Sequence, residues 1–171
     1  MIDPLDLSLL VFRLAVGAVM VAHGYNHIWG GGKIAGTGRW FESLGMKPGW
    51  LHAWTASLTE LGAGVLLLFG LFTPLAGGAV VGVMLVAWIT NHRKNGFFIF
   101  RPGEGYEYVM TLTAAGLLFC GTGAGRLSLD HALDLDGFGW PTALGCAALG
   151  IGGALALLLT FWRPVPSPAA E

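Results

Sequence analysis

Long apolar runs are the feature of this chain that most constrains its fold. A helix needs about 20 mostly apolar residues to cross the hydrocarbon core of a bilayer. Five stretches reach or approach that length, at residues 5–28, 51–72, 74–92, 106–121 and 141–162. The period-two alternation of strands is absent, and only helices or closed barrels satisfy their backbone hydrogen bonds in lipid. The pattern therefore predicts an all-α membrane protein.

Charged residues are too few for a water-soluble surface. Of the 171 residues, 54% are hydrophobic and 11% are charged, whereas an ordinary soluble domain has about 25% charged residues. This composition excludes an ordinary soluble enzyme. A net charge of -1 gives no basic footprint for nucleic acid. The partner that the composition predicts is therefore the lipid bilayer.

The distribution of lysine and arginine between the apolar runs predicts the orientation in the membrane. Short cytoplasmic loops are enriched in these residues. Seven lie in the segments after the first, third and fifth runs, and one lies after the fourth. The seven are Lys33, Arg39, Lys47, Arg93, Lys94, Arg101 and Arg163, and the one is Arg126. We therefore expect an N-terminus outside the cell and a cytoplasmic C-terminus.

Six ionisable residues lie within the runs or at their ends, where burial in lipid is costly and points to function. At 100° per residue, the three in the first run project within an arc of about 80°. With a rise of about 1.5 Å per residue, all six line the side of the bundle toward the cytoplasm, the deepest at roughly 22 Å. They are Arg13 (the deepest), His23, His27, Glu60, His92 and Glu107.

Several chemical roles fit this set. His23 and His27 are four residues apart, so their imidazoles share one helix face and form, with Glu60, a candidate site for a transition metal. The same residues suit a proton relay or the binding of a quinone headgroup. The alternatives are structural, namely histidines that only pack or reach the interface, and a Glu60 that pairs with Arg13 or His23.

Small residues and the two cysteines inside the runs are expected to serve packing. Glycines such as Gly17, Gly78 and Gly82 allow helix backbones to approach closely, and such faces also permit a homo-oligomer. Cys120 and Cys146 lie in separate runs and form no C-x-x-C motif. We expect both to be isolated thiols.

Seven short motifs follow one another along about the first 130 residues. They are His23-Gly24, Phe41-Glu42-Ser43-Leu44-Gly45, Glu60-Leu61-Gly62, Gly70-Leu71-Phe72-Thr73, Asn95-Gly96-Phe97-Phe98, Tyr106-Glu107 and Gly125-Arg126-Leu127-Ser128-Leu129-Asp130. In this order they resemble the DoxX family of bacterial membrane proteins. The resemblance implies a four-helix transmembrane bundle over residues 1–130, in a bacterial cell membrane. The chain departs from the family at His27, where members often have lysine, and in residues 131–171, which add an outer loop, a fifth transmembrane helix and a short tail.

The resemblance also implies a redox role. Some relatives are tied to thiosulfate:quinone oxidoreduction, and others to membrane-associated thiol and oxidative-stress complexes. We therefore predict a membrane subunit of a quinone- or thiol-linked redox system, in which the six ionisable residues form the cofactor site and protein partners complete the system. The sequence leaves open whether the subunit is itself catalytic and whether its cofactor is a quinone or a transition metal. The alternative is a small-molecule or ion transport or scaffold protein without redox chemistry.

Overall fold

The chain folds into a bundle of helices. The computed structural model describes residues 2–164, and within them it has no strand beyond one isolated bridge. Five long helices make the bundle, and three short ones lie at its ends. The long helices are α1 (Pro4–Trp29), α3 (Gly49–Phe69), α4 (Thr73–Thr90), α5 (Glu107–Thr122) and α7 (Trp140–Phe161); the short ones are α2 (Lys33–Ser43), the 3-10 helix η1 (His92–Lys94) and α6 (Leu129–Ala132).

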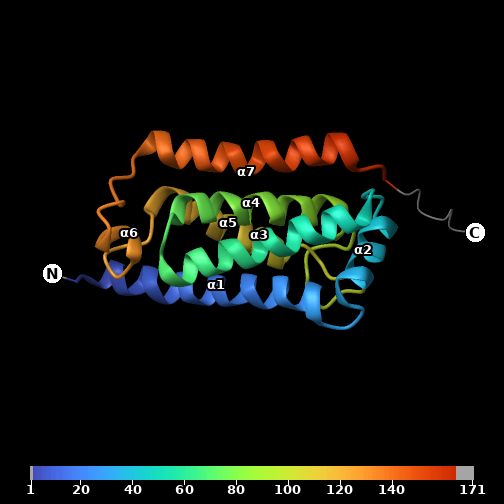
Figure 1. The fold of residues 1–171 in the computed structure, drawn as a ribbon, viewed down its shortest axis with the longest axis horizontal. Coiled ribbons are helices and arrows are strands. Elements are labelled where there is room, and N and C mark those ends of the chain that lie inside the picture. Colours follow the sequence, from blue (N-terminus) through green and yellow to red (C-terminus); the bar gives the residue numbers. More distant parts are fainter. Residues whose placement is uncertain (1, 165–171) are drawn as a thin grey trace, which may run out of the picture.

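Helix α4 is the centre of the bundle. It packs against α3, α5 and α7, while α1 packs mainly on α3. Figure 1 shows α1, α3, α4 and α7 along the long axis, with α2 across one end and α6 at the other. Helix α1 begins at the end that holds α6, and α7 finishes at the end that holds α2. The first and last long helices of the bundle therefore begin and finish at opposite ends.

The predicted all-α membrane fold is confirmed in its main features. Four helices, namely α1, α3, α4 and α7, are long and apolar enough to cross a membrane. The predicted fourth run forms α5, which is a helix of 16 residues. It is shorter than the roughly 20 residues of a typical span, so its crossing stays a prediction. The observed helices begin and end within about three residues of the predicted runs.

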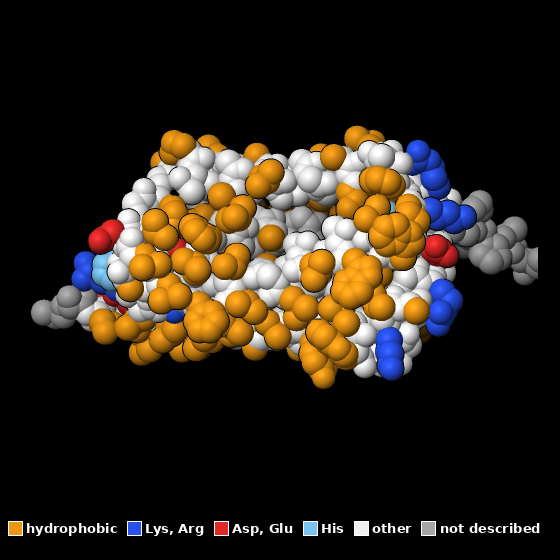
Figure 2. Space-filling view, in the orientation of Figure 1, with side chains coloured by type: hydrophobic (Ala, Val, Ile, Leu, Met, Phe, Trp, Pro, Cys, Tyr) orange, Lys and Arg blue, Asp and Glu red, His pale blue; other side chains and the backbone are white. Residues whose placement is uncertain are grey.

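The surface shows the expected division between lipid-facing and polar regions. Hydrophobic side chains cover the middle of the molecule, and most of the visible lysine and arginine side chains gather at the end that holds α2 (Figure 2). This end is the one predicted to be cytoplasmic. The structure shows the polarity of the two ends, and which end faces the cytoplasm stays a prediction.

Glycine contacts set the spacing of the helices. A Cβ at Gly17 of α1 would lie 2.9 Å from the carbonyl oxygen of Gly64 in α3, and a Cβ at Gly82 of α4 would lie 3.1 Å from that of Gly150 in α7. A Cβ at Gly78 would also meet the backbone of α7. Real Cβ contacts are almost never this short, so larger residues would push the helices apart. The predicted packing role of these glycines is confirmed.

Helix α2 was not predicted, because the sequence analysis treated residues 33–43 as part of a polar loop. The segment has too few apolar residues to cross a membrane, but one of them, Phe41, is buried against Met46 and Ala53. Phe41 holds a short amphipathic helix against α3, together with a close contact between Gly38 and Gly49 and a hydrogen bond from the Gly49 N–H to Glu42. The isolated bridge lies next to it and joins Met46 to Trp162 at the end of α7.

Arg13 is a structural residue at the end of the bundle opposite α2. Its side chain is only 2% exposed. Its Nη1 donates to the carbonyl oxygens of Leu67 (2.9 Å) and Leu68 (2.8 Å), and its Nη2 donates to that of Leu127. The last carbonyls of a helix have no partner within it. Arg13 therefore donates hydrogen bonds to the carbonyl groups at the end of α3 and links the segment before α6 to that end.

Asp130 binds the backbone at the start of α4, in the same region of the bundle. Its fully buried carboxylate accepts hydrogen bonds from the backbone N–H groups of Phe72 (2.7 Å) and Thr73 (3.0 Å), at the start of α4. The Asp130 N–H donates to the carbonyl oxygen of Gly70. Arg13 and Asp130 thus hold the turn between α3 and α4 from both sides.

We expect Arg13→Leu to destabilise the fold strongly. The change removes three hydrogen bonds to carbonyl oxygens. That of Leu67 still accepts from the Gly70 N–H, but those of Leu68 and Leu127 lose the Arg13 donor, and each buried polar group left unpaired costs about 1–3 kcal/mol. The midpoint of thermal unfolding in detergent should fall by more than about 5 °C. The exposed Arg39→Gln is the matched control. Equal midpoints for Arg13→Leu and the wild type would contradict this role of Arg13.

The predicted orientation is testable by labelling in intact cells. In a Cys120→Ala/Cys146→Ala background, Asp134→Cys should react with a membrane-impermeant maleimide, because it is exposed in the outer loop. Ser43→Cys, exposed on α2 at the other end, should react only after the cells are opened. The reverse pattern would overturn the orientation derived from the lysine and arginine count.

Candidate functional site

A cavity of about 760 Å³ lies inside the bundle, mainly between α1, α3, α4 and α7. Its volume is within the roughly 300–1,000 Å³ of ligand pockets. We call it the central cavity. Most of its wall is apolar, and its polar side chains gather toward the end of the bundle that holds α2. These are His23, His27, His52, Thr55, Thr59, Glu60, Thr90, Asn91, His92, Glu104 and Tyr108.

Glu60 and His27 form an ionisable pair on this wall. Glu60 is 4% exposed, and its Oε2 lies 3.1 Å from Nδ1 of His27. Gly24 explains why the two helices come close enough. A Cβ at Gly24 would lie 2.8 Å from the carbonyl oxygen of Ser57, so only glycine lets α1 approach α3 one turn before this pair. A side chain at position 24 would therefore separate His27 from Glu60.

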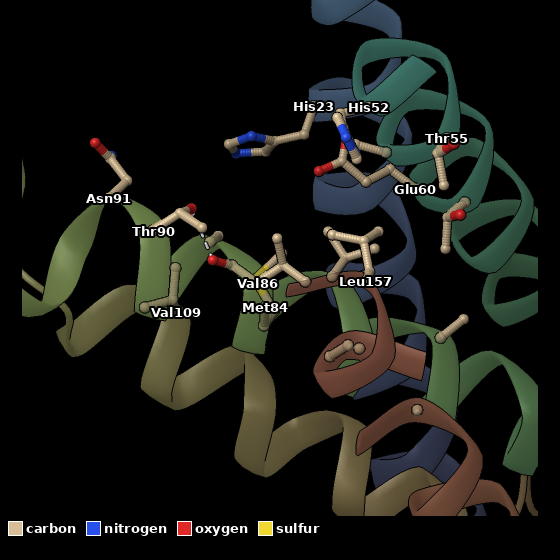
Figure 3. Close-up of a pocket in the computed structure, with 18 of the residues that line it drawn as sticks. His23, His52, Thr55, Glu60, Met84, Val86, Thr90, Asn91, Val109 and Leu157 are labelled. Carbon is tan, nitrogen blue, oxygen red and sulfur yellow. Dashed lines mark hydrogen bonds between the residues drawn. The ribbon is translucent and has the colours of Figure 1, made fainter. Parts of the chain in front are cut away.

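His23 reaches a tyrosine on another helix. Its Nε2 lies 3.3 Å from the hydroxyl of Tyr108 in α5, and the two rings stack with centroids 5.9 Å apart. Figure 3 shows His23, Glu60 and His52 together on one side of the cavity, with Thr90 and Asn91 of α4 across from them. The polar end thus combines one buried carboxylate with several groups that donate or accept hydrogen bonds.

His52 is a buried polar residue with unused hydrogen-bonding capacity. It is 3% exposed and packs between the rings of Phe41 and Phe161, whose centroids lie 6.4 Å and 5.3 Å from its own. The backbone of Lys47 lies near the ring, but neither ring nitrogen makes a hydrogen bond of good geometry. Because buried polar atoms are nearly always paired in native proteins, His52 has the character of a ligand-binding group.

His92 is already committed to local structure. Its Nδ1 lies 2.9 Å from the carbonyl oxygen of Glu104, and its Nε2 lies 3.3 Å from the side-chain amide of Asn91. Since a carbonyl only accepts, Nδ1 carries the proton and Nε2 accepts from the amide. His92 therefore closes the cavity and orders the loop before α5, and it has no free nitrogen for a ligand.

Two of the six predicted site residues lie elsewhere. Arg13 belongs to the cluster at the opposite end, and Glu107, which does not line the cavity, accepts a hydrogen bond from the N–H of the lining residue Ile99 (2.7 Å). The predicted pairing of Glu60 with Arg13 or His23 is wrong, because Glu60 contacts His27. At about 1.5 Å per residue, Arg13 and His27 are about 21 Å apart along α1.

The metal hypothesis finds no supporting arrangement. In the region from residue 2 to residue 164, no three histidine, cysteine, aspartate or glutamate side chains lie together as metal ligands would. His27 and Glu60 meet, but His23 turns toward Tyr108. Cys120 and Cys146 are both free thiols, and neither lines the central cavity.

The sequence analysis missed His52, although a signal for it was present. His52, Ala56, Thr59 and Glu60 follow the i, i+4, i+7, i+8 spacing of one helix face, and all four line the cavity. A search for polar residues on the face of Glu60 would have found His52. Tyr108 has no comparable signal, because nothing in the sequence shows which helix lies opposite His23.

Comparison with known proteins places the chain in a family. Residues 8–93 match the family model named DoxX. A protein of Bacillus subtilis (strain 168) named "Putative oxidoreductase CatD" is 30% identical over 125 residues, which are 73% of this chain and 86% of that protein. No solved structure matches the chain.

Double-mutant cycles test the revised pairing of Glu60. In unfolding experiments in detergent, Glu60→Gln and His27→Gln should show a coupling energy of about 0.5–3 kcal/mol, because the residues are in contact. Glu60→Gln and Arg13→Leu should instead be additive to within about 0.5 kcal/mol, as expected of distant sites. Coupling to Arg13 with none to His27 would contradict the arrangement described here.

Proposed function

Because the chain belongs to the DoxX family of membrane proteins, we propose that it is a membrane component of a redox system that binds a quinone in the central cavity. The observation that carries the proposal is the contact between Glu60 and His27 at the polar end of a cavity whose other half is apolar. Ionisable groups buried within membrane helices are costly and commonly mark functional sites. The name of the Bacillus subtilis relative supports a redox role.

The polar end of the cavity has the groups that a quinone headgroup needs. When bound, a quinone would supply two-electron, two-proton redox chemistry. Its oxygens accept hydrogen bonds, which Tyr108 or a ring nitrogen of His52 can donate. After reduction these oxygens become hydroxyl groups, and the Glu60 carboxylate can accept hydrogen bonds from them. The Glu60 and His27 pair can also hold a proton between its carboxylate and imidazole, as exchange with a reduced headgroup requires.

The other predicted classes gain less support from the cavity. Ion transport across the membrane needs polar groups along a whole path, but the half of the cavity farther from α2 is lined by Leu75, Gly78, Ala79 and Leu149. Thiol chemistry needs a cysteine at the site, and both cysteines lie outside its wall. A site for a membrane quinone needs a polar region for the headgroup and an apolar region beside it, and this cavity has both.

Binding of a tail-less quinone tests the proposal directly. Purified protein should bind 2,3-dimethoxy-5-methyl-1,4-benzoquinone, measured by equilibrium dialysis in detergent against a detergent blank. Glu60→Gln should weaken binding about tenfold, which corresponds to about 1.4 kcal/mol. Asp134→Asn is the control, because this carboxylate is exposed at the far end of the bundle. Circular dichroism of each variant verifies the fold.

The proposal fails if neither this probe nor menadione binds above the detergent blank. It also fails if a correctly folded Glu60→Gln binds as tightly as the wild type. Elemental analysis of the same preparation checks the competing metal hypothesis. Stoichiometric metal that is lost in Glu60→Gln would favour a metal site in place of the quinone.

A further inference from the structure

The apolar half of the central cavity has no role in binding a quinone headgroup. We propose that it holds the isoprenoid tail of the same quinone, and that α7 forms the wall that retains this tail. The inference rests on the proposed function and goes beyond it, because it specifies a lipid-soluble, long-chain substrate and a helix that selects for it. The observations that support it are the shape, polarity and lining of the cavity.

The cavity is long and changes polarity along its length. Its wall follows α4 from Leu75 to Thr90, which is about 22 Å at the helical rise of about 1.5 Å per residue. Around Thr90 the lining includes the histidines, Glu60 and Asn91. Around Leu75 it is apolar. A ligand that fills this space has a polar head and an extended apolar tail.

Small residues make the apolar half narrow and smooth. Gly78, Ala79 and Gly82 of α4 and Gly150, Gly153 and Ala154 of α7 line it, beside the backbone contact of Gly78 and Gly82 with α7. Leu75 and Leu149, which are 46% and 63% exposed, line the same space. The groove therefore reaches the lipid-facing surface of the bundle, so a tail can enter it from the bilayer.

Helix α7 is attached firmly at one end of this groove. Backbone hydrogen bonds join Arg163 N–H to the Gly45 carbonyl (2.9 Å) and Lys47 N–H to the Phe161 carbonyl (3.3 Å). The indole N–H of Trp162 also donates to the Leu44 carbonyl (2.9 Å). These bonds hold the end of α7 over the polar half of the cavity, beside Phe161 and His52.

A second, smaller cavity lies between α3 and α7. This space of about 350 Å³ lies at Leu51, Ala156 and Thr160 and shares the lining residues His52, Thr55 and Leu157 with the central cavity. His52 is nearly fully buried, and its ring nitrogens have unused hydrogen-bonding capacity. It is therefore positioned to bind the headgroup where the two spaces meet, with the apolar groove leading away from it. Figure 3 shows Leu157 below Glu60, next to Val86 and Met84.

Two adjacent glycines of α7 provide a matched test. A Cβ at Gly153 or at Gly152 meets no atom within 4 Å, so either position accepts a larger side chain without a clash at that atom. Only Gly153 lines the cavity. Gly153→Leu should therefore occupy the groove, and Gly152→Leu should place the same side chain on another face of the same helix.

The experiment compares ubiquinone-2, which has two isoprene units, with its tail-less parent 2,3-dimethoxy-5-methyl-1,4-benzoquinone. Wild-type protein should bind ubiquinone-2 more tightly in equilibrium dialysis. Gly153→Leu should weaken the binding of ubiquinone-2 about tenfold and leave the tail-less compound unchanged. Gly152→Leu should change neither affinity.

Each other outcome has a defined meaning. The tail groove is overturned if the wild type binds both compounds equally, if Gly153→Leu weakens neither, or if Gly152→Leu weakens ubiquinone-2 as much as Gly153→Leu does. It is also overturned if extraction and mass spectrometry show that Gly153→Leu loses bound phospholipid while its quinone content is unchanged, because the groove then holds an acyl chain. Failure of both compounds to bind the wild type would overturn the proposed function itself.

Discussion

Close contact between glycine backbones is the interaction on which the rest of this structure depends. Lipid tails are as apolar as leucine side chains, so helices in a bilayer associate through close packing rather than through the hydrophobic effect. Gly17 and Gly64 bring α1 to α3, and Gly24 continues that contact beside Ser57. Gly77 and Gly116 join α4 to α5 in the same way. Where α4 meets α7, glycines also leave space beside the contact, and the central cavity occupies that space. Glycine therefore allows the helices to pack closely and also leaves the space of the central cavity.

The two polar clusters of the bundle use buried charge in different ways. Arg13 and Asp130 direct their hydrogen bonds to backbone groups at the turn between α3 and α4, where helix ends leave donors and acceptors without partners. Those hydrogen bonds end on backbone groups of the protein, although the Nε of Arg13 is buried without a partner of its own. Glu60 and His27 meet each other instead, beside a cavity and near a histidine whose nitrogens are not paired. The first cluster is structural, because its charged groups bind the ends of helices. The second retains capacity for a ligand.

The sequence predicted features that depend on apolar length better than features that depend on contacts between helices. The long helices were found because burying a backbone in lipid requires long apolar runs. Helix α2 was missed because it is held against α3 by contacts between helices, at Phe41, Gly38 and Glu42, that no long apolar run reveals. Helical periodicity put Arg13, His23 and His27 on one face, and of these His23 and His27 line the central cavity, while Arg13 is buried elsewhere and His23 is exposed. Residues that share a face can lie far apart along the helix axis. Which residue of α1 lies level with Glu60 depends on the axial register of α1 against α3. Gly24 and Gly64 set that register, and no single-helix pattern shows it.

The polar and the apolar half of the central cavity are built from different parts of the chain, so the two parts of a ligand can be recognised independently. The family match over residues 8–93 includes α1, α3 and α4, and therefore His27, Glu60 and His52. Tyr108 and the whole of α7 lie beyond that match. The polar half of the cavity is thus built mainly from the matched region, whereas the outer wall of the apolar half comes from a helix outside it. Since α7 is joined to the bundle by a glycine contact and by a few backbone hydrogen bonds, substitutions along its inner face can change the shape of the groove without disturbing the Glu60 and His27 pair. The length and shape of the apolar part of a ligand would then be selected separately from the chemistry of its head.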